Sequence, residues 1–369
     1  MFVFEKFLAS AVRNSAKFCT FAYVNERKRR IAFIVNPISG TQSKKDMPEV
    51  IEAVLDKEQF ESRVIFTEYA GHAAEIAKAC AAEQTDIVAA VGGDGTVNEV
   101  ARSLVHTETA LAIVPCGSGN GLARHLCLPI DTRKSLEIIN QCRIESFDYG
   151  IINGLPFFCT CGMGFDAFIS LKFAEAGKRG PITYVENVLK EGLKYKPEVY
   201  EVTDDSGTYH YKAFLIACAN ASQYGNNAYI APGATMKDGE MDVIIMEPFN
   251  ALDAPQIAAD LFMKTLGNNS KIKTFRTKHL EIHRATPGAI HYDGDPIMTD
   301  PDIDIHIEHL GIKIVTNPEA TEDAAQPNPV LNAFSDFFNN INNVREDIER
   351  GGRRIHALNK LMLRTLSKL

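Results

Sequence analysis

The chain has 369 residues, of which 45% are hydrophobic and 23% charged, and its formal net charge at pH 7 is −8. This composition is ordinary for a globular protein, and the length allows two domains of about 100–200 residues each. No stretch contains the roughly 18 consecutive apolar residues of a membrane span, and charges interrupt residues 1–18 too often for a signal peptide. We therefore expect a cytoplasmic protein that at most contacts the inner face of the membrane.

The charges are unevenly distributed along the chain. Residues 1–30 carry seven basic and two acidic side chains, a net charge of +5, and residues 350–369 carry six basic side chains and no acidic one. Residues 31–349 therefore hold a net charge of −19. Apolar residues recur at helical spacing near both ends, so we predict a basic amphipathic leader over residues 1–30 and a linker with a basic helical tail over residues 319–369. The alternatives are a frayed leader and a tail that packs on the body or on a second subunit, as in a homodimer.

Residues 31–143 alternate short apolar runs with segments of helical periodicity. The predicted strands are Ile31–Val35, Val64–Phe66, Asp86–Val91 and Ala110–Val114. The predicted helices include Pro48–Leu55, Ala73–Ala82 and Thr132–Cys142. Such alternation is typical of a parallel sheet with helices on both faces, and we predict a doubly wound α/β nucleotide domain here.

Residues 144–318 show a different pattern. Several segments alternate apolar and polar residues and are separated by glycine, asparagine, aspartate and proline. This pattern is typical of antiparallel sheet, so the second domain is predicted to be β-sandwich-like and the whole fold α/β plus β. Helices are expected over Ala254–Leu266 and Phe173–Lys194, and a last separate strand over Gly311–Val315.

The eight cysteines are scattered, and the closest pair is Cys159 and Cys161. Because no second pair stands at metal-ligand spacing, we interpret all of them as reduced core or loop thiols. The histidines form no HExxH motif, which leaves no sequence signal for a zinc peptidase.

Two glycine-rich loops carry the clearest chemical signal. The first, Gly92–Thr96, lies between a predicted buried strand and a helix start, and the second, Pro115–Gly121, follows the next strand. Glycines let backbone N–H groups approach an oxyanion, and a helix N-terminus adds the positive end of its dipole. Adjacent strands of an open α/β sheet present their loops to one ligand, so we expect both loops to bind phosphate. Neither loop contains GxxxxGK[ST], so the chain is not a P-loop protein.

Three motifs in order, NPISG at residues 36–40, GGDGTVNE at 92–99 and PCGSGNGLARHL at 115–126, resemble the diacylglycerol kinase catalytic family, which includes bacterial lipid kinases and sphingosine kinases. The resemblance covers about residues 30–317 and implies an ATP site built on these loops and on the end of the second strand. The implied ATP-binding residues are Asn36, Pro37, Ser39, Gly40, Thr67, Gly92, Gly93, Asp94, Gly95, Thr96, Val97, Asn98 and Ser118. For Thr67, a helix cap is the alternative.

The resemblance also implies a metal site and a catalytic base. Thr235, Asp238 and Glu240 match positions associated with a structural Mg²⁺, and their oxygens suit a hard cation, although a plain acidic turn is the alternative. Asp295 stands where the family's DGE element has its proton acceptor, but it is one methylene shorter than glutamate. Asp94 is the alternative base, as in sphingosine kinases. Either carboxylate could accept the proton of a primary alcohol as the γ-phosphate is transferred.

Asp166 matches an acid that holds the hydroxyl or amine of a lipid headgroup, and a helix N-cap is the alternative. Together these implications predict an ATP- and Mg²⁺-dependent lipid kinase that phosphorylates diacylglycerol or a sphingoid base at a membrane surface, with no nucleic-acid partner. The rivals are an NAD- or polyphosphate-using kinase, which shares GGDG, and a non-catalytic, nucleotide-responsive regulator that binds membranes.

Overall fold

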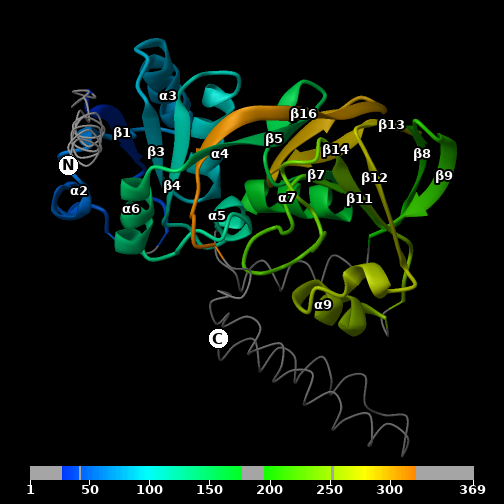
Figure 1. The fold of residues 1–369 in the computed structure, drawn as a ribbon. Coiled ribbons are helices and arrows are strands. Elements are labelled where there is room, and N and C mark those ends of the chain that lie inside the picture. Colours follow the sequence, from blue (N-terminus) through cyan, green and yellow to red (C-terminus); the bar gives the residue numbers. More distant parts are fainter. Residues whose placement is uncertain (1–26, 41–42, 177–194, 251–252, 321–369) are drawn as a thin grey trace, which may run out of the picture.

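The computed structural model describes residues 27–40, 43–176, 195–250 and 253–320 (Figure 1). The predicted leader, the predicted tail and most of the helix expected over residues 173–194 lie outside this part of the chain. None of the described helices is long and apolar enough to cross a membrane.

The N-terminal half is the predicted α/β domain. Its elements are β1 (Arg29–Val35), α2 (Met47–Val54), β2 (Phe60–Phe66), α3 (His72–Ala82), β3 (Ile87–Gly92), α4 (Asp94–Leu104), β4 (Ala110–Pro115), α5 (Gly121–His125) and α6 (Thr132–Gln141). The strands pair in parallel in the order β2, β1, β3, β4. Helices α3 and α4 pack together on one face of the sheet, and α2 and α6 pack together on the other. Right-handed crossover connections require this arrangement for the strand order β2, β1, β3, β4. Strands β3 and β4 are buried along their whole length because helices cover both faces of the sheet.

The C-terminal half contains most of the antiparallel strands. Its elements are β5 (Ile144–Ile152), β6 (Leu155–Phe157), β7 (Thr160–Gly164), α7 (Phe165–Ala176), β8 (Glu198–Asp204), β9 (Gly207–Ala213), β10 (Leu215–Ala219), β11 (Met241–Met246), α9 (Ala254–Phe262), a 3-10 helix (Leu266–Asn268), β12 (Ile272–Thr277), β13 (His279–Arg284), β14 (Gly288–Tyr292), β15 (Asp295–Thr299) and β16 (Asp302–Val315). One sheet has the order β12, β11, β10, β7, β14, β15, and the other contains β16, β13, β8 and β9.

A single hydrophobic core joins these two sheets face to face. Met163 and Val243 of the first sheet and Tyr200 and Ile305 of the second are buried in it together. Apolar side chains alternate with exposed ones along β13, as expected for a strand with one buried face. The predicted α/β domain followed by a sandwich-like domain is therefore confirmed.

Strand β16 connects the two halves of the molecule. Its first part pairs with β13, and its end pairs in parallel with β4 through Ile314 and Leu111, so one sheet of ten strands runs through both halves (Figure 1). The last strand predicted over Gly311–Val315 is present, but it is the end of β16 rather than an element of its own. A register shift between Glu308 and Ile312, with Leu310 at φ 53°, interrupts the apolar alternation without ending the strand.

Helix α7 also differs from the prediction, because it begins at Phe165 rather than at Phe173. The sequence there follows the glycine-containing strand β7 directly, without a connecting loop. This early start places Asp166 in the first turn of a helix, next to the end of a buried strand.

Candidate active site

The glycine loops and Thr67 lie at one edge of the parallel sheet. Val35 at the end of β1 pairs with Phe66 and Val91, and Gly92 pairs with Pro115. The aligned strand ends place the segments that follow them side by side. Backbone hydrogen bonds continue beyond the strands, from Thr67 N to Val35 O at 2.9 Å and from Cys116 N to Gly92 O at 2.7 Å. Thr67 does not cap α3, whose N-cap residue is Gly71.

The first glycine loop ends in an open helix terminus. Gly93 is the N-cap of α4 and makes no side-chain capping bond, so the N–H groups of the first turn are available to an anion. A Cβ at Gly95 would have no heavy atom within 4 Å, whereas one at Gly92 would lie 2.5 Å from Thr96 Oγ1. A side chain at residue 92 would therefore clash with Thr96, whereas one at residue 95 would point into open space.

The NPISG loop packs beside this helix start. Asn36 Nδ2 donates to Thr96 Oγ1 at 3.0 Å, which joins the loop to α4. Gly40 has φ 68°, and a Cβ there would lie 2.0 Å from the carbonyl oxygen of Cys116, so only glycine fits this approach to the second loop. Among the predicted ATP-binding residues, the exposed ones are Pro37, Gly40, Gly95 and Ser118, and the buried ones are Ser39, Gly92, Thr96, Val97 and Asn98.

Asp94 links the two glycine loops. Its Oδ2 accepts a hydrogen bond from Asn120 N at 2.9 Å, and its Oδ1 accepts one from Gly121 N at 2.7 Å. The side chain of Asn120 in turn bonds both the N–H and the carbonyl of Gly117. Both carboxylate oxygens of Asp94 are thus engaged with backbone, which is the geometry of a brace between loops.

Two basic side chains, those of Lys44 and Arg124, lie close to the glycine loops. Lys44 is buried, and its ammonium donates to the carbonyl of Ser39. Burial raises the pKa of the Cys116 thiol, and the Lys44 charge opposes that rise, which places the ammonium near the second loop. Arg124 Nε donates to Gly119 O at 3.0 Å. Lys44 could not be predicted, because a lysine in a polar loop carries no distinguishing pattern.

Asp295 lies on the other half of the molecule, at the start of β15. Its side chain is 53% exposed, and its Oδ2 lies 3.3 Å from Nη2 of Arg102 on α4. The Arg102 guanidinium also stacks on the Tyr292 ring, 4.5 Å from the centroid. The helix that carries the first glycine loop therefore holds Asp295 too, about 12 Å further along its axis at ~1.5 Å per residue. No sequence signal identified Arg102.

The turn before Asp295 is fixed by the other acid of the DGD element. Asp293 and Gly294 have φ 52° and 88°, which is typical of a tight two-residue hairpin turn. The Asp293 carboxylate accepts hydrogen bonds from the backbone N–H groups of Phe158, Cys159 and Thr160, at 2.8, 2.7 and 3.1 Å. Burial raises its pKa to about 6, although these donors act to lower it. Asp293 therefore anchors the hairpin that positions Asp295.

Asp166 is joined to the same hairpin through a buried histidine. Its Oδ2 lies 3.0 Å from His291 Nε2 and 3.4 Å from the Tyr224 hydroxyl, and its Oδ1 accepts from Ala167 N at 2.8 Å. His291 Nδ1 faces Gly294 N at 3.4 Å. The bonded N–H belongs to the next residue rather than to the N2 or N3 position, so Asp166 is not a simple N-cap.

The predicted Mg²⁺ ligands surround an arginine. Arg276 contacts Asp238 with one terminal nitrogen, and its other nitrogens lie 3.7 Å from Glu240 and 3.7 Å from Asp242. Thr235 is exposed nearby in the sequence. The guanidinium already supplies the positive charge among these acids, so the residues as arranged do not fit a Mg²⁺ ion.

The seven cysteines in the described part of the chain are all free. This agrees with the expectation of reduced thiols, and Cys159, Cys161 and Cys218 lie in the core.

Together, the fold and this site define an α/β protein with an appended β-sandwich and two glycine-rich loops at one end of its parallel sheet. Residues 30–152 match the family model of the diacylglycerol kinase catalytic domain, and residues 160–311 match that of the YegS C-terminal NAD kinase beta sandwich-like domain. The chain therefore belongs to the diacylglycerol kinase catalytic-domain family of lipid kinases, as its motifs predicted.

Its relatives are similar over most of their length. A diacylglycerol kinase of Bacillus subtilis is 24% identical over 273 residues, which cover 72% of this chain and 90% of the relative. An uncharacterized protein of Synechocystis is 27% identical over 288 residues, covering 73% of this chain and 66% of the relative. Among solved structures, a putative diacylglycerol kinase of Bacillus anthracis is 21% identical, with a TM-score of 0.67 over 79% of this chain and 97% of that one. This last similarity shows the shared fold.

Proposed function

We propose that the protein transfers the γ-phosphate of ATP to the primary hydroxyl of diacylglycerol. One observation carries this proposal: Arg102 ties the exposed carboxylate of Asp295 to the same helix whose uncapped N-terminus forms the first glycine loop. A phosphate-binding terminus and a carboxylate base are the two parts that phosphoryl transfer to an alcohol requires. The relatives in Bacillus subtilis and Staphylococcus saprophyticus are named diacylglycerol kinase, which supports this acceptor over a sphingoid base.

In this proposal the nucleotide is bound mainly by backbone. The N–H groups of the first turn of α4, around Gly95, hold the phosphates, and Lys44 and Arg124 add positive charge from either side. Mg²⁺ bound with ATP would neutralise further charge on the phosphates. Thr67 directly follows β2 and Ser118 lies three residues beyond the end of β4, and we assign the hydroxyls of both to the nucleotide.

We assign Asp295 as the base and Asp94 as the brace of the loops. Asp295 is exposed on the hairpin, while both oxygens of Asp94 already accept backbone hydrogen bonds. Asp166 then holds a hydroxyl of the acceptor, and His291 fixes its orientation relative to the hairpin. Asp295 takes the proton of the acceptor hydroxyl as the oxygen attacks the γ-phosphate.

A screen with radiolabelled ATP tests this function. The acceptors are dispersed diacylglycerol, sphinganine, ceramide and monoacylglycerol, with NAD as a soluble acceptor. We expect labelled lipid from diacylglycerol and not from NAD. Preferential labelling of sphinganine would move the protein to the sphingosine kinase branch. ATP binding without turnover on any acceptor would support the non-catalytic regulator instead.

We also propose that the basic ends bring the acidic body to anionic lipid. Residues 1–30 and 350–369 carry net charges of +5 and +6, and each Lys or Arg near an anionic surface contributes about 1 kcal/mol. Deleting residues 319–369 should reduce co-sedimentation with anionic vesicles in a salt-sensitive way, while activity on detergent-dispersed lipid persists. A change of oligomeric state with unchanged vesicle binding would instead make the tail a subunit contact.

A further inference from the structure

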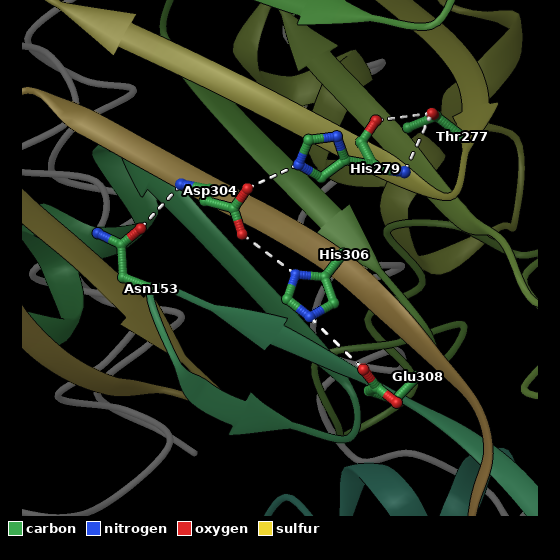
Figure 2. Close-up of polar contacts among 6 residues, drawn as sticks. All are labelled: Asn153, Thr277, His279, Asp304, His306 and Glu308. Carbon is green, nitrogen blue, oxygen red and sulfur yellow. Dashed lines mark hydrogen bonds and ion pairs between the residues drawn. The ribbon is translucent and has the colours of Figure 1, made fainter.

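Histidines and acids gather on the solvent face of one sheet, away from the glycine loops. His279 and Glu281 of β13 lie directly opposite His306 and Asp304 of β16 in the antiparallel register. Residues two apart on a strand share a face, so these four side chains stand at the corners of a square on the exposed side. Figure 2 shows the two imidazoles on either side of the Asp304 carboxylate.

The distances among three corners of this square, His279, Glu281 and Asp304, suit a metal ion. His279 Nε2 lies 2.6 Å from Asp304 Oδ2, and His306 Nδ1 lies 3.1 Å from Asp304 Oδ1. The ligand atoms of His279, Glu281 and Asp304 all lie within 4.8 Å of one another. Bonds of about 2.0–2.2 Å to a tetrahedral Zn²⁺ place ligand atoms roughly 3.3 Å apart. Because Glu281 and Asp304 are exposed and His279 is only half-buried, modest rotamer changes can bring them to that spacing.

We propose that His279, Glu281 and Asp304 bind a divalent transition metal of the Zn²⁺ type, with water as the fourth ligand. Imidazole together with carboxylate favours Zn²⁺, Ni²⁺ or Cu²⁺, whereas Mg²⁺ selects oxygen ligands. The site is therefore distinct in its metal preference from the Mg²⁺ that accompanies ATP. Such an ion would clamp β13 to β16, the strand that joins the two halves of the molecule.

The surroundings of the square hold its ligands in place. Asn153 Oδ1 accepts from Asp304 N at 2.8 Å, and Asn153 N donates to Asp304 O at 2.9 Å, which fixes the backbone of the central ligand. The hydroxyl of Thr277 bonds the backbone of His279 in the same way. His306 lies between two acids, with Nδ1 3.1 Å from Asp304 Oδ1 and Nε2 3.7 Å from Glu308, so it holds the Asp304 carboxylate from the side opposite His279 (Figure 2).

The neighbouring pair His283 and Asp302 supplies a matched control. These residues also lie opposite each other on β13 and β16, and their side-chain atoms are 2.6 Å apart. In the described residues, however, the one group of three or more candidate ligands is the group around Asp304. A histidine–aspartate ion pair alone is therefore present at His283, and a three-ligand site only at His279.

Titration of the tag-free, metal-stripped full chain with Zn²⁺ tests the proposal. Wild type and His283→Ala should each bind one Zn²⁺ at this face with the same affinity, and Co²⁺ should give the visible absorption of a tetrahedral site. His279→Ala and Asp304→Asn should weaken binding at least tenfold, while their metal-free melting temperatures stay close to wild type. A tenfold excess of Mg²⁺ should not compete.

Equal Zn²⁺ affinity in wild type and His279→Ala would overturn the proposal. So would a loss in His283→Ala as large as that in His279→Ala, because that result describes diffuse binding to a histidine-rich surface. Lipid kinase activity does not enter either criterion, so failure of the metal site and failure of the proposed function remain distinguishable.

Discussion

The nucleotide half of the candidate site is built of backbone, and the acceptor half is built of side chains. Around Gly92–Thr96 and Pro115–Gly121, the groups that face the ligand are N–H donors placed by glycines and by one helix start. On the acceptor side, Asp166, His291 and Asp295 come from different elements, and the partner of Asp295 is 193 residues away in sequence. A site made of backbone N–H groups can therefore be recognised from short contiguous motifs. A site made of side chains from distant elements can be recognised only in the folded structure.

The two acids that competed for the role of base illustrate this difference. Asp94 belongs to the backbone half, and both of its carboxylate oxygens accept hydrogen bonds from N–H groups of the second loop. Asp295 belongs to the side-chain half and stays exposed beside Arg102. Sequence alone left the two roles open, and their hydrogen-bond partners support the proposal that Asp295 is the base and Asp94 the brace.

The largest expected effect distinguishes these two acids. Asp295→Asn should lower kcat by about 100-fold or more, the usual contribution of a positioned general base, with little change in the KM for ATP. Asp94→Asn should instead raise the KM for ATP and lower the melting temperature, because one loop N–H would face an amide NH₂ group. Steady-state kinetics measure both effects, with Asp300→Asn at the end of the same hairpin as the control. A selective loss of kcat in Asp94→Asn would exchange the roles.

A substitution at Gly95 tests whether backbone alone binds the phosphates. Ala at this helical position meets no protein atom within 4 Å and should leave the melting temperature equal or slightly higher. It should weaken ATP binding by about tenfold or more, because the methyl group occupies the space that a phosphate needs. Gly267→Ala, which is equally unobstructed, should change neither property. Unchanged ATP affinity in Gly95→Ala would place the phosphates elsewhere.

His125 connects the two halves and should make that connection sensitive to pH. Its Nδ1 accepts from Ser222 N at 3.1 Å, and burial lowers its pKa from 6.5 to about 4. The unfolded chain then binds a proton that the folded chain does not, so the free energy of unfolding falls as pH drops from 6.5 toward 4. Urea unfolding at pH 7.5 and 5 should show a loss of about 2 kcal/mol from this group. The loss should be smaller in His125→Asn, and an identical loss would contradict the assignment.

The smallest expected effect concerns Mg²⁺ and the folded state. Because Arg276 stands among Asp238, Glu240 and Asp242, the wild-type melting temperature should be the same in EDTA and in Mg²⁺. Arg276→Met removes this charge, and its melting temperature should fall in EDTA and recover partly in Mg²⁺. Differential scanning fluorimetry measures both. If Mg²⁺ raised the melting temperature of the wild-type protein, the original prediction of a Mg²⁺ site at Thr235, Asp238 and Glu240 would be supported instead.

Much of the candidate site was predictable, for reasons visible in particular residues. Only glycine fits at residues 40 and 92, because a Cβ there would collide with Cys116 or Thr96. These glycines are therefore visible as motifs in the sequence. Lys44 and Arg102 were not predicted, because a lysine in a polar loop and an arginine on a helix look like ordinary surface residues. Their roles depend on what packs against them, Ser39 in one case and the Asp295 hairpin in the other.

The sequence by itself determined the alternation of strands and helices, the change to antiparallel sheet and the place of both glycine loops. These features follow from local periodicity and from backbone conformations that only glycine adopts easily. The tertiary structure decided that β16 runs unbroken through both halves, that Arg276 lies among the acids, and that Arg102 reaches Asp295. Contacts between residues far apart in the chain depend on the packing of whole elements, and no short stretch of sequence contains that information.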